Sequence, residues 1–430
     1  MTPPHPEDTP NLVFANSRGE ILDYDGLELA GAAGSFLRRP EKEELIELPE
    51  GSELFVLPGR LPVGFEPGSD EPVLLAEDPY RPGESIQAVA AFMAPAHTAI
   101  LTAAFTRANG KPPLLPLFAY TAVGWYRDRF WVAAFRSDPD PRQDARNFDL
   151  EKIHRRTVRR LKAHAGNRLI QHLGKCCLTY GCPAARNYFL DRWEAPLPSS
   201  PVCNASCAGC ISLQPSGCCP ATQDRIRFVP TPAEIAEIAV PHLQRAKRPV
   251  VSFGQGCEGE PLLQGKTLVD AVREIRTRTG RGTINLNTNG SLPAVVEQMA
   301  EAGLDSIRVS LNSARPELHH RYYRPQGFDF EDVCHSMAVM KEHGRHVSLN
   351  YFILPGFTDD PGEFTAFCDL VDRNRPDLIQ LRNLNMDPEY YLQVLCHEPA
   401  APPMGMLTWL RELRRRFPWL RFGYFNPPLR

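Results

Sequence analysis

The first 175 of the 430 residues contain no cysteine, although the whole chain has 12. Nine of these 12 lie between Cys176 and Cys257. Disulfide bonds throughout the chain are therefore excluded, because the N-terminal part would have none. The clustering indicates a local metal or redox site, and a reducing compartment would favour metal-bound over disulfide-bonded cysteines.

Targeting and membrane segments are also missing. Residues 1–8 lack a basic segment followed by an apolar run, so no secretory signal is predicted. Residues 85–105 form an uncharged stretch long enough to span a membrane, but it contains Pro95 and His97 and reads better as buried strands or a short core helix. We therefore expect a cytoplasmic protein with no membrane segment. There is no Gly-rich phosphate loop of the Walker type either.

The composition excludes several broad classes. The chain carries 48 basic and 51 acidic residues, so it is not a polybasic nucleic-acid binder. With 43% hydrophobic and 23% charged residues, it is neither disordered nor fibrous. A chain of 430 residues exceeds what one hydrophobic core usually serves, which predicts at least two domains.

Four stretches of different character follow one another along the chain. Residues 1–140 are β-rich, with short apolar runs between Gly, Pro and Asp turns. Residues 141–194 hold a basic helix, expected at 150–173, and a cysteine-containing connector. We expect a catalytic core in residues 195–400, and a C-terminal helix and tail in residues 401–430. The basic helix is typical of a solvated face, the alternative being a patch for RNA, a phosphate or an acidic substrate.

The core alternates predicted strands and helices from residue 250 onward. Each unit takes about 22 to 35 residues, as parallel βαβ units do. Parallel α/β folds bind ligands at the carboxyl ends of their strands. The polar residues and glycine that fall at these ends are Asn287, Asn289, Ser310, Asn312 and Gly356.

The strongest local signal is Cys203-Asn-Ala-Ser-Cys207-Ala-Gly-Cys210. Three thiolates within eight residues can bind one face of a metal cluster, and soft thiolates select iron–sulfur clusters or zinc. Structural zinc usually has four ligands in separated pairs, whereas three ligands would leave one iron of a cubane cluster open. From spacing alone, a chance triplet remains open, because Cys218, Cys219 and Cys257 could complete other sets.

This motif resembles the hallmark of the radical S-adenosylmethionine (radical SAM) superfamily, three cysteines spaced by three and then two residues. The resemblance implies a 4Fe–4S cluster whose open iron binds SAM. It also implies that reduction cleaves SAM to methionine and a 5′-deoxyadenosyl radical, which abstracts hydrogen from a substrate. The implied fold is α/β, a partial parallel (β/α)6 barrel, here with an additional β-rich N-terminal domain.

Further motifs extend the resemblance over about residues 195–395. Glu258-Gly259-Glu260-Pro261 resembles the Gly-Gly-Glu-Pro motif that contacts the SAM amino group. Asn289 matches the polar end of the next strand, and Ser310 and Asn312 match the ribose and carboxylate contacts. Gly356 lies in a segment that resembles the adenine-side strand and turn. The resemblance thus implies that Cys203, Cys207 and Cys210 bind iron and that the other residues bind SAM.

Two positions depart from the family pattern. Gly209 stands where the family usually has an aromatic residue before the third cysteine, so other apolar groups must hold adenine. Glu258 stands at the first glycine of the Gly-Gly-Glu-Pro motif, and the role of its side chain is open. The first barrel strand is also weak, because residues 196–201 are rich in proline.

The remaining clustered cysteines suggest a second iron–sulfur cluster. If the pairs Cys176-Cys177 and Cys218-Cys219 lie in extended chain, each pair points to opposite sides and supplies one ligand. Cys176, Cys182, Cys218 and Cys257 are then the candidate ligands. The alternative is a set of buried or substrate-facing thiols.

The leading hypothesis is therefore a radical SAM enzyme, an oxidoreductase or transferase, that receives electrons from a donor such as flavodoxin or ferredoxin. Its substrate is open: RNA, a peptide and a small metabolite fit equally well. The alternative from another class is a non-catalytic iron–sulfur or zinc protein that binds RNA.

Overall fold

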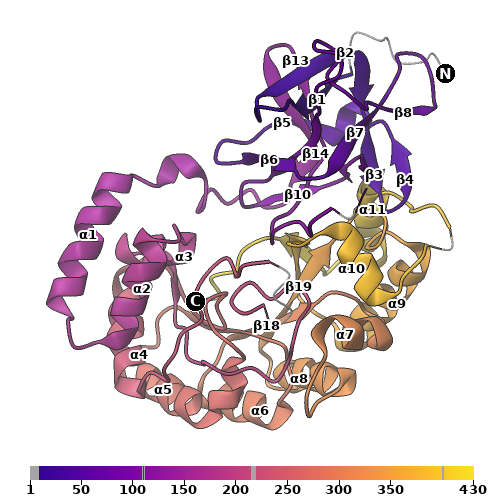
Figure 1. Ribbon diagram of the computed structural model, residues 1–430. Coiled ribbons are helices and arrows are strands. Elements are labelled where there is room, and N and C mark those ends of the chain that lie inside the picture. Colours follow the sequence, from indigo (N-terminus) through magenta and orange to yellow (C-terminus); the bar gives the residue numbers. More distant parts are fainter. Residues whose placement is uncertain (1–8, 109, 111, 215–218, 400) are drawn as a thin grey trace. The chain divides into compact units, whose positions relative to one another are not determined.

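The computed structural model describes residues 9–108, 110, 112–214, 219–399 and 401–430. The chain folds into two compact units, which are described separately (Figure 1). Unit 1 consists of residues 1–139, 352–366 and 381–418, and unit 2 of residues 140–351, 367–380 and 419–430.

Unit 2 is organised by a parallel sheet that follows the chain order from β15 to β21. Neighbouring strands pair in parallel from β15 through β19, and β20 pairs in parallel with β21. Buried residues fill both faces of the central strands, as in β17, where all six residues are buried. The strands are β15 (Arg192–Pro196), β16 (Lys247–Phe253), β17 (Thr283–Thr288), β18 (Ser306–Leu311), β19 (His346–Ile353), β20 (Leu378–Asn383) and β21 (Arg421–Gly423).

Helices connect these strands and lie along the outer side of the curved sheet (Figure 1). Their buried residues recur on one face, as in α5, where Leu268, Val272 and Ile275 are buried. The predicted partial parallel barrel is therefore confirmed. The helices are α4 (Pro232–Arg245), α5 (Gly265–Arg278), α6 (Pro293–Ala302), α7 (Pro316–Tyr323), α8 (Phe330–Glu342) and α9 (Pro361–Asn374), with a 3₁₀ turn η4 (Pro261–Gln264) before α5.

Three helices precede the barrel: α1 (Leu150–Ala163), α2 (Arg168–Leu178) and α3 (Pro183–Phe189). The single helix expected at 150–173 is thus wrong, because the chain breaks around Gly166 and restarts at Asn167. The Asn167 side chain accepts a hydrogen bond from the Ile170 amide, which makes it the N-cap of α2. The first barrel strand is also earlier than the proline-rich segment suggested, since β15 ends at Pro196.

Unit 1 confirms the expected β-rich N-terminal region. Among the described residues, its main sheet contains 11 strands, which pair in antiparallel fashion. Valines and alanines of β1, β9, β13 and β14 form one core cluster. Its elements are β1 (Asn11–Ala15), β2 (Ile21–Leu29), β3 (Gly31–Ala33), β4 (Phe36–Arg38), η2 (Lys42–Glu44), β5 (Leu45–Glu47), β6 (Glu53–Leu57), β7 (Arg60–Phe65), β8 (Pro72–Leu74), β9 (Gln87–Phe92), β10 (His97–Ala99), β11 (Thr102–Ala103), β12 (Phe105–Arg107), β13 (Val123–Tyr126), β14 (Arg129–Arg136), α10 (Pro388–Leu395) and α11 (Met406–Arg416).

The uncharged stretch at residues 85–105 forms β9, β10 and β11 rather than a helix. No helix among the described residues is long and apolar enough to cross a bilayer. The strands β13 and β14 form an antiparallel hairpin around residues 126–129. Its two turn residues, Arg127 and Asp128, have φ of 50° and 58°, the left-handed conformation that a two-residue hairpin turn requires.

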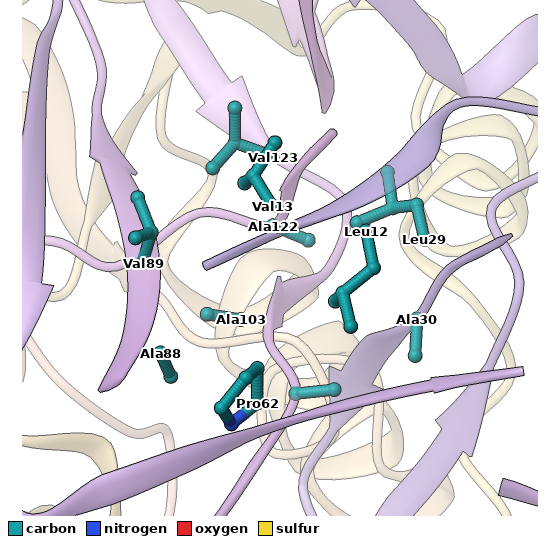
Figure 2. A pocket seen from close by; sticks show the side chains of 11 residues that line it. Leu12, Val13, Leu29, Ala30, Pro62, Ala88, Val89, Ala103, Ala122 and Val123 are labelled. Carbon is teal, nitrogen blue, oxygen red and sulfur yellow. The ribbon is translucent and has the colours of Figure 1, made fainter. Parts of the chain in front are cut away.

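Unit 1 contains a small pocket between its strands (Figure 2). Leucine, valine, alanine and proline side chains line it, among them Leu12, Val89 and Pro62. None of these side chains offers a hydrogen-bonding or metal-binding group. The pocket is a packing feature of the β-rich core and has no chemistry of its own.

Candidate active site and metal sites

The loop from Cys203 to Cys210 follows β15 in unit 2, and its three cysteines are half-buried. Two of its backbone amides donate to the last turn of α7: Ser206 to the Tyr323 carbonyl at 2.9 Å, and Ala208 to the Tyr322 carbonyl at 3.0 Å. An isolated bridge between Ala205 and Pro325 adds a third connection. The loop that carries the cysteine motif is therefore tied to the barrel by backbone contacts.

The turn at Glu258–Pro261 pairs with the chain just before the cysteine loop. The Gly259 amide donates to the Ser200 carbonyl at 2.7 Å, and the Glu260 amide donates to the Val202 carbonyl at 2.9 Å. A Cβ atom at Gly259 would lie 2.0 Å from the Val202 carbonyl oxygen, a contact that backbone atoms cannot relieve by side-chain rotation. Glycine is required here because the two backbones approach so closely.

The Glu258 side chain is buried and accepts four hydrogen bonds from its own scaffold. Its Oε2 accepts from the Ser199 amide at 2.7 Å, the Ser200 amide at 3.0 Å and the Ser199 hydroxyl at 3.1 Å. Its Oε1 accepts from the Gln255 amide at 2.6 Å. Burial raises the pKa of Glu258 to about 7, and these donors act in the opposite direction by favouring the carboxylate.

Glu260 connects the turn to the carboxyl end of β17. Its carboxylate accepts from the Asn289 amide at 2.8 Å, from the Thr288 hydroxyl and from the Leu262 amide at 3.0 Å. Burial raises the pKa of Glu260 to about 7. Its negative charge also contributes to the raised pKa of Cys203, so the carboxylate acts directly on the cysteine loop.

Asn289 reaches the cysteine loop through a residue that sequence reasoning missed. Its Nδ2 donates to Oδ1 of Asn204 at 2.9 Å, and the Asn204 carbonyl accepts from the Gln326 amide at 2.8 Å. Asn204 thus joins three segments of the barrel at the cysteine loop. Its position directly after Cys203 is the sequence feature that could have marked it as a site residue.

Ser310 and Asn312 both lie at the carboxyl end of β18. The Ser310 hydroxyl accepts from Asn350 Nδ2 at 3.5 Å, and Asn312 is fully buried with its Nδ2 donating to the Leu318 carbonyl at 3.3 Å. Gly356 belongs to unit 1, where the Gly34 amide donates to the neighbouring Pro355 carbonyl. Gly356 has φ of 88°, and a Cβ there would lie 1.9 Å from the Gly34 nitrogen, so packing alone requires glycine.

The three motif cysteines suit a cluster better than a single ion. Burial raises the pKa of Cys203 to about 11 and that of Cys207 well above its ordinary value, and each is raised further by the charge of Cys210. Three thiolates on one eight-residue loop need a cation to compensate their charge. The sulfur atoms of Cys203, Cys207 and Cys210 do not all lie within 4.8 Å of one another. Two thiolates bound to one zinc ion, by comparison, lie about 3.8 Å apart. Arg225, which the sequence did not single out, donates to Cys210 Sγ at 3.5 Å.

The cysteines predicted to bind a second cluster lie in different environments. Cys176 and Cys257 meet, and a hydrogen bond with the Cys257 thiol, assisted by His172, lowers the pKa of Cys176 to about 5. Cys182 is half-buried at the start of α3, and its amide donates to the Cys176 carbonyl at 3.0 Å. Cys218 lies outside the described residues. Cys176 and Cys177 lie in helix α2 and not in extended chain, so the reasoning from strand alternation was wrong.

The interior of the barrel is polar and closely hydrogen-bonded. Asn426, from the C-terminal tail, donates to Glu194 Oε1 at 2.8 Å and accepts from Gln380 at 2.9 Å. Asn285 donates to Asn287 Oδ1 at 2.8 Å and accepts from the Ser306 hydroxyl at 2.7 Å. This network fixes the orientation of the strands whose carboxyl ends carry the site residues.

Comparison with known proteins identifies the segment that holds this site. Residues 197–368 match the Radical SAM superfamily. A GTP 3′,8-cyclase of Limosilactobacillus fermentum is 33% identical over 104 residues, which cover 24% of this chain and 30% of that protein. A GTP 3′,8-cyclase of Aquifex aeolicus is 30% identical over 177 residues, 40% of this chain and 52% of that protein. The chain thus spans between about a third and a half of the length of these relatives.

A probable dual-specificity RNA methyltransferase RlmN of Parasynechococcus marenigrum is 32% identical over 129 residues, 26% of this chain and 36% of that protein. Among solved structures, methylornithine synthase has 17% identity and a TM-score of 0.38, covering 56% of this chain and 68% of that chain. The superfamily uses a 4Fe–4S cluster and SAM, the cofactors that the cysteine loop and the adjoining turn fit. Residues 197–368 of this chain are thus similar to the radical SAM superfamily.

Proposed function

We propose that the chain is a radical SAM enzyme with residues 195–400 as its catalytic core. Cys203, Cys207 and Cys210 would bind a 4Fe–4S cluster. When bound, the cluster supplies the electron that cleaves SAM to methionine and a 5′-deoxyadenosyl radical, which abstracts hydrogen from the substrate. The reaction class is that of an oxidoreductase or a transferase.

The observation that carries this proposal is the pairing of the cysteine loop with the Glu258–Pro261 turn. The backbone bonds from Gly259 and Glu260 hold the two motifs side by side, at a distance that excludes any side chain at Gly259. A cluster and a ligand chelated to it require such a fixed relation between their two binding segments. Proteins that kept the cysteines only for structural zinc would not need the turn.

Each remaining motif residue of unit 2 has a proposed part in holding SAM. Glu260 and Pro261 would present the turn to the amino group of SAM, and Asn289 would hold the turn and the cysteine loop together. Ser310 and Asn312 would contact the ribose and carboxylate groups from β18. The half-buried Ile211 next to Gly256 is a candidate apolar contact with adenine in place of the missing aromatic residue. Glu258 would act indirectly, by fixing the scaffold through its four hydrogen bonds.

The site residues do not indicate a substrate class, but the names of two relatives suggest which substrates to test first. Their names include GTP and RNA, so a purine nucleotide and RNA come before a peptide or another small metabolite. On the basic helix, Arg156 and Arg160 bond to Asp191 and are engaged within the chain. Lys152, Arg155, Arg159 and Lys162 are exposed and are available to a phosphate backbone. If they bind RNA, its affinity should fall steeply with salt.

We also propose that a small electron-transfer protein such as flavodoxin or ferredoxin reduces the enzyme in the cytoplasm. Free cysteines among the described residues are consistent with a reducing compartment. Either donor should support the same SAM cleavage that a chemical reductant supports.

The decisive experiment is anaerobic incubation of the reconstituted protein with SAM and reductant, followed by measurement of 5′-deoxyadenosine. We expect the wild type to form it and Cys207→Ala to lose both the product and most of the bound iron. Cys334→Ala is the matched control, because Cys334 is a buried cysteine of α8 outside the motif. Bound zinc without 5′-deoxyadenosine in the wild type would reject the proposal.

A further inference from the structure

A second group of metal-binding side chains lies in unit 2 outside the radical SAM motif. It consists of His172 and Cys176 on α2 and Cys257 in the loop after β16. One ligand atom from each residue lies within 4.8 Å of the other two. Within the described parts of the chain, no other set of three His, Cys, Asp or Glu residues converges in this way.

The spacing of these atoms matches a single ion. His172 Nε2 and Cys176 Sγ are 3.5 Å apart. Bonds of about 2.0 Å to nitrogen and 2.3 Å to sulfur at a tetrahedral angle separate the two atoms by about 3.5 Å. An iron–sulfur cluster would bind its ligands on different iron atoms and would therefore spread them more widely. One imidazole and two thiolates also bind zinc in known sites, where a water or another ligand takes the fourth position.

The framework on both sides of the group is fixed. His172 and Cys176 are four residues apart on α2, so they lie on the same helical face. On the other side, the Cys257 carbonyl accepts a hydrogen bond from the Ile226 amide at 2.8 Å. The next residue is Glu258, whose carboxylate accepts hydrogen bonds from backbone amides through both oxygens. Cys176 and Cys257 have 1% and 5% of their surface exposed, so both thiols lie in the protein interior and have little contact with solvent. Ligands held in this way lose little entropy when a metal binds.

The neighbouring thiols are not part of the group. Cys177 points to another side of α2, where its Sγ lies 3.4 Å from the Thr157 hydroxyl. Cys182 contacts Cys176 through its backbone but is not among the converging ligand atoms. The site therefore needs His172, which sequence reasoning missed although the His-Leu-Gly-Lys-Cys spacing places both ligands on one face of a helix.

We propose that His172, Cys176 and Cys257 bind one zinc ion, separate from the cluster held by the radical SAM cysteines. Both cysteines coordinate the ion as thiolates, and binding releases any proton that they still carry. The ion joins α2 to the loop that leads into the Glu258–Pro261 turn. It thereby acts as a clamp on the scaffold of the SAM site and takes no part in electron transfer.

The test uses the full chain with Cys203, Cys207 and Cys210 all changed to alanine, so that iron of the first cluster does not interfere. We expect about one zinc per chain by elemental mass spectrometry. Adding Cys176→Ser or Cys257→Ser should remove most of this zinc. Adding Cys177→Ser instead should leave it in place, and this is the matched control because Cys177 is the adjacent buried cysteine of the same helix.

A second measurement does not depend on how the variants fold. Zinc-edge X-ray absorption of the wild type should show two sulfur ligands and at least one imidazole nitrogen at the distances given above. Iron and sulfide that persist in the triple-alanine protein and disappear with Cys176→Ser would overturn the zinc proposal in favour of a second iron–sulfur cluster. A Cys176–Cys257 disulfide without bound metal, detected by mass spectrometry under anaerobic purification, would also overturn it.

Discussion

Replacing Gly259 with alanine tests the central feature of the site, the close contact between the cysteine loop and the turn. The added Cβ would lie 2.0 Å from the Val202 oxygen, 2.5 Å from the Val202 carbonyl carbon and 3.1 Å from the Cys203 nitrogen. All three are backbone atoms, so the two segments must separate. This separation breaks the hydrogen bonds from the Gly259 and Glu260 amides.

The expected magnitude follows from these contacts. Overpacking by one methyl group costs about 1–3 kcal/mol. Two lost backbone hydrogen bonds add about 1 kcal/mol each. The sum is roughly 3–5 kcal/mol, which at about 2–4 °C per kcal/mol lowers the melting temperature of unit 2 by roughly 6–20 °C. Because Cys203 moves with Val202, the content of bound iron after reconstitution should fall as well.

Two other glycines of unit 2 provide graded controls. Gly280 has nothing within 4 Å of an added Cβ, so Gly280→Ala should leave both measurements unchanged. At Gly256 an added Cβ would meet only the ends of the Gln223 and Ile211 side chains, which can rotate, so Gly256→Ala should have a small effect. Differential scanning calorimetry and iron analysis on the three variants give the comparison. If Gly259→Ala melts and binds iron like Gly280→Ala, the contact does not hold the site together.

Two further predictions concern stability. Burial lowers the pKa of His242 to about 4 from its ordinary value of 6.5, and its Nε2 is hydrogen-bonded to the Trp193 carbonyl. The neutral ring therefore stabilises the fold above pH 6.5. This contribution, about 2–3 kcal/mol, is lost as the pH falls toward 4. Urea unfolding at pH 7 and pH 4.5 should show a smaller loss for His242→Gln than for the wild type, whereas the exposed His154→Gln should behave like the wild type. In unit 1, Asp387→Asn breaks a buried ion pair with Arg60 at 2.6 Å and should destabilise that unit by about 3–5 kcal/mol without changing the bound iron. An Asp387→Asn protein with wild-type stability in calorimetry would contradict this account of the pair.

The series of parallel strands from β16 to β20 could be predicted from the sequence, because each contains a short run of mainly apolar and small polar residues and alternates with a helical pattern. The strand β15 could not, since Arg192-Trp-Glu-Ala-Pro has two charged residues and a proline. It forms because its neighbour β16 supplies a parallel partner, with Ala195 opposite Val251. Pairing with a distant segment thus overrides a weak local preference.

In the candidate site, too, some features could be predicted from the sequence and others could not. The cysteine triplet and the Glu258–Pro261 turn are each one short continuous segment, so their resemblance to family motifs could be recognised in the sequence. The contact between Cys176 and Cys257 joins residues about eighty positions apart, and no local pattern reports such a distance. Cys396 lies exposed at the end of α10 in a left-handed conformation with φ of 48°, a placement that no sequence pattern indicated.

Glu258 shows why a departure from a family pattern need not weaken the site. A glycine at this position would leave the amides of Ser199, Ser200 and Gln255 without the carboxylate that they bond to here. Each buried amide left without an acceptor costs about 1–3 kcal/mol. The scaffold of this chain is thus built around the glutamate, and the two amides that pair with the cysteine loop belong to the following residues, Gly259 and Glu260. The side chain at position 258 therefore supports the turn from within, while the backbone contacts of the motif remain those that a glycine would also allow.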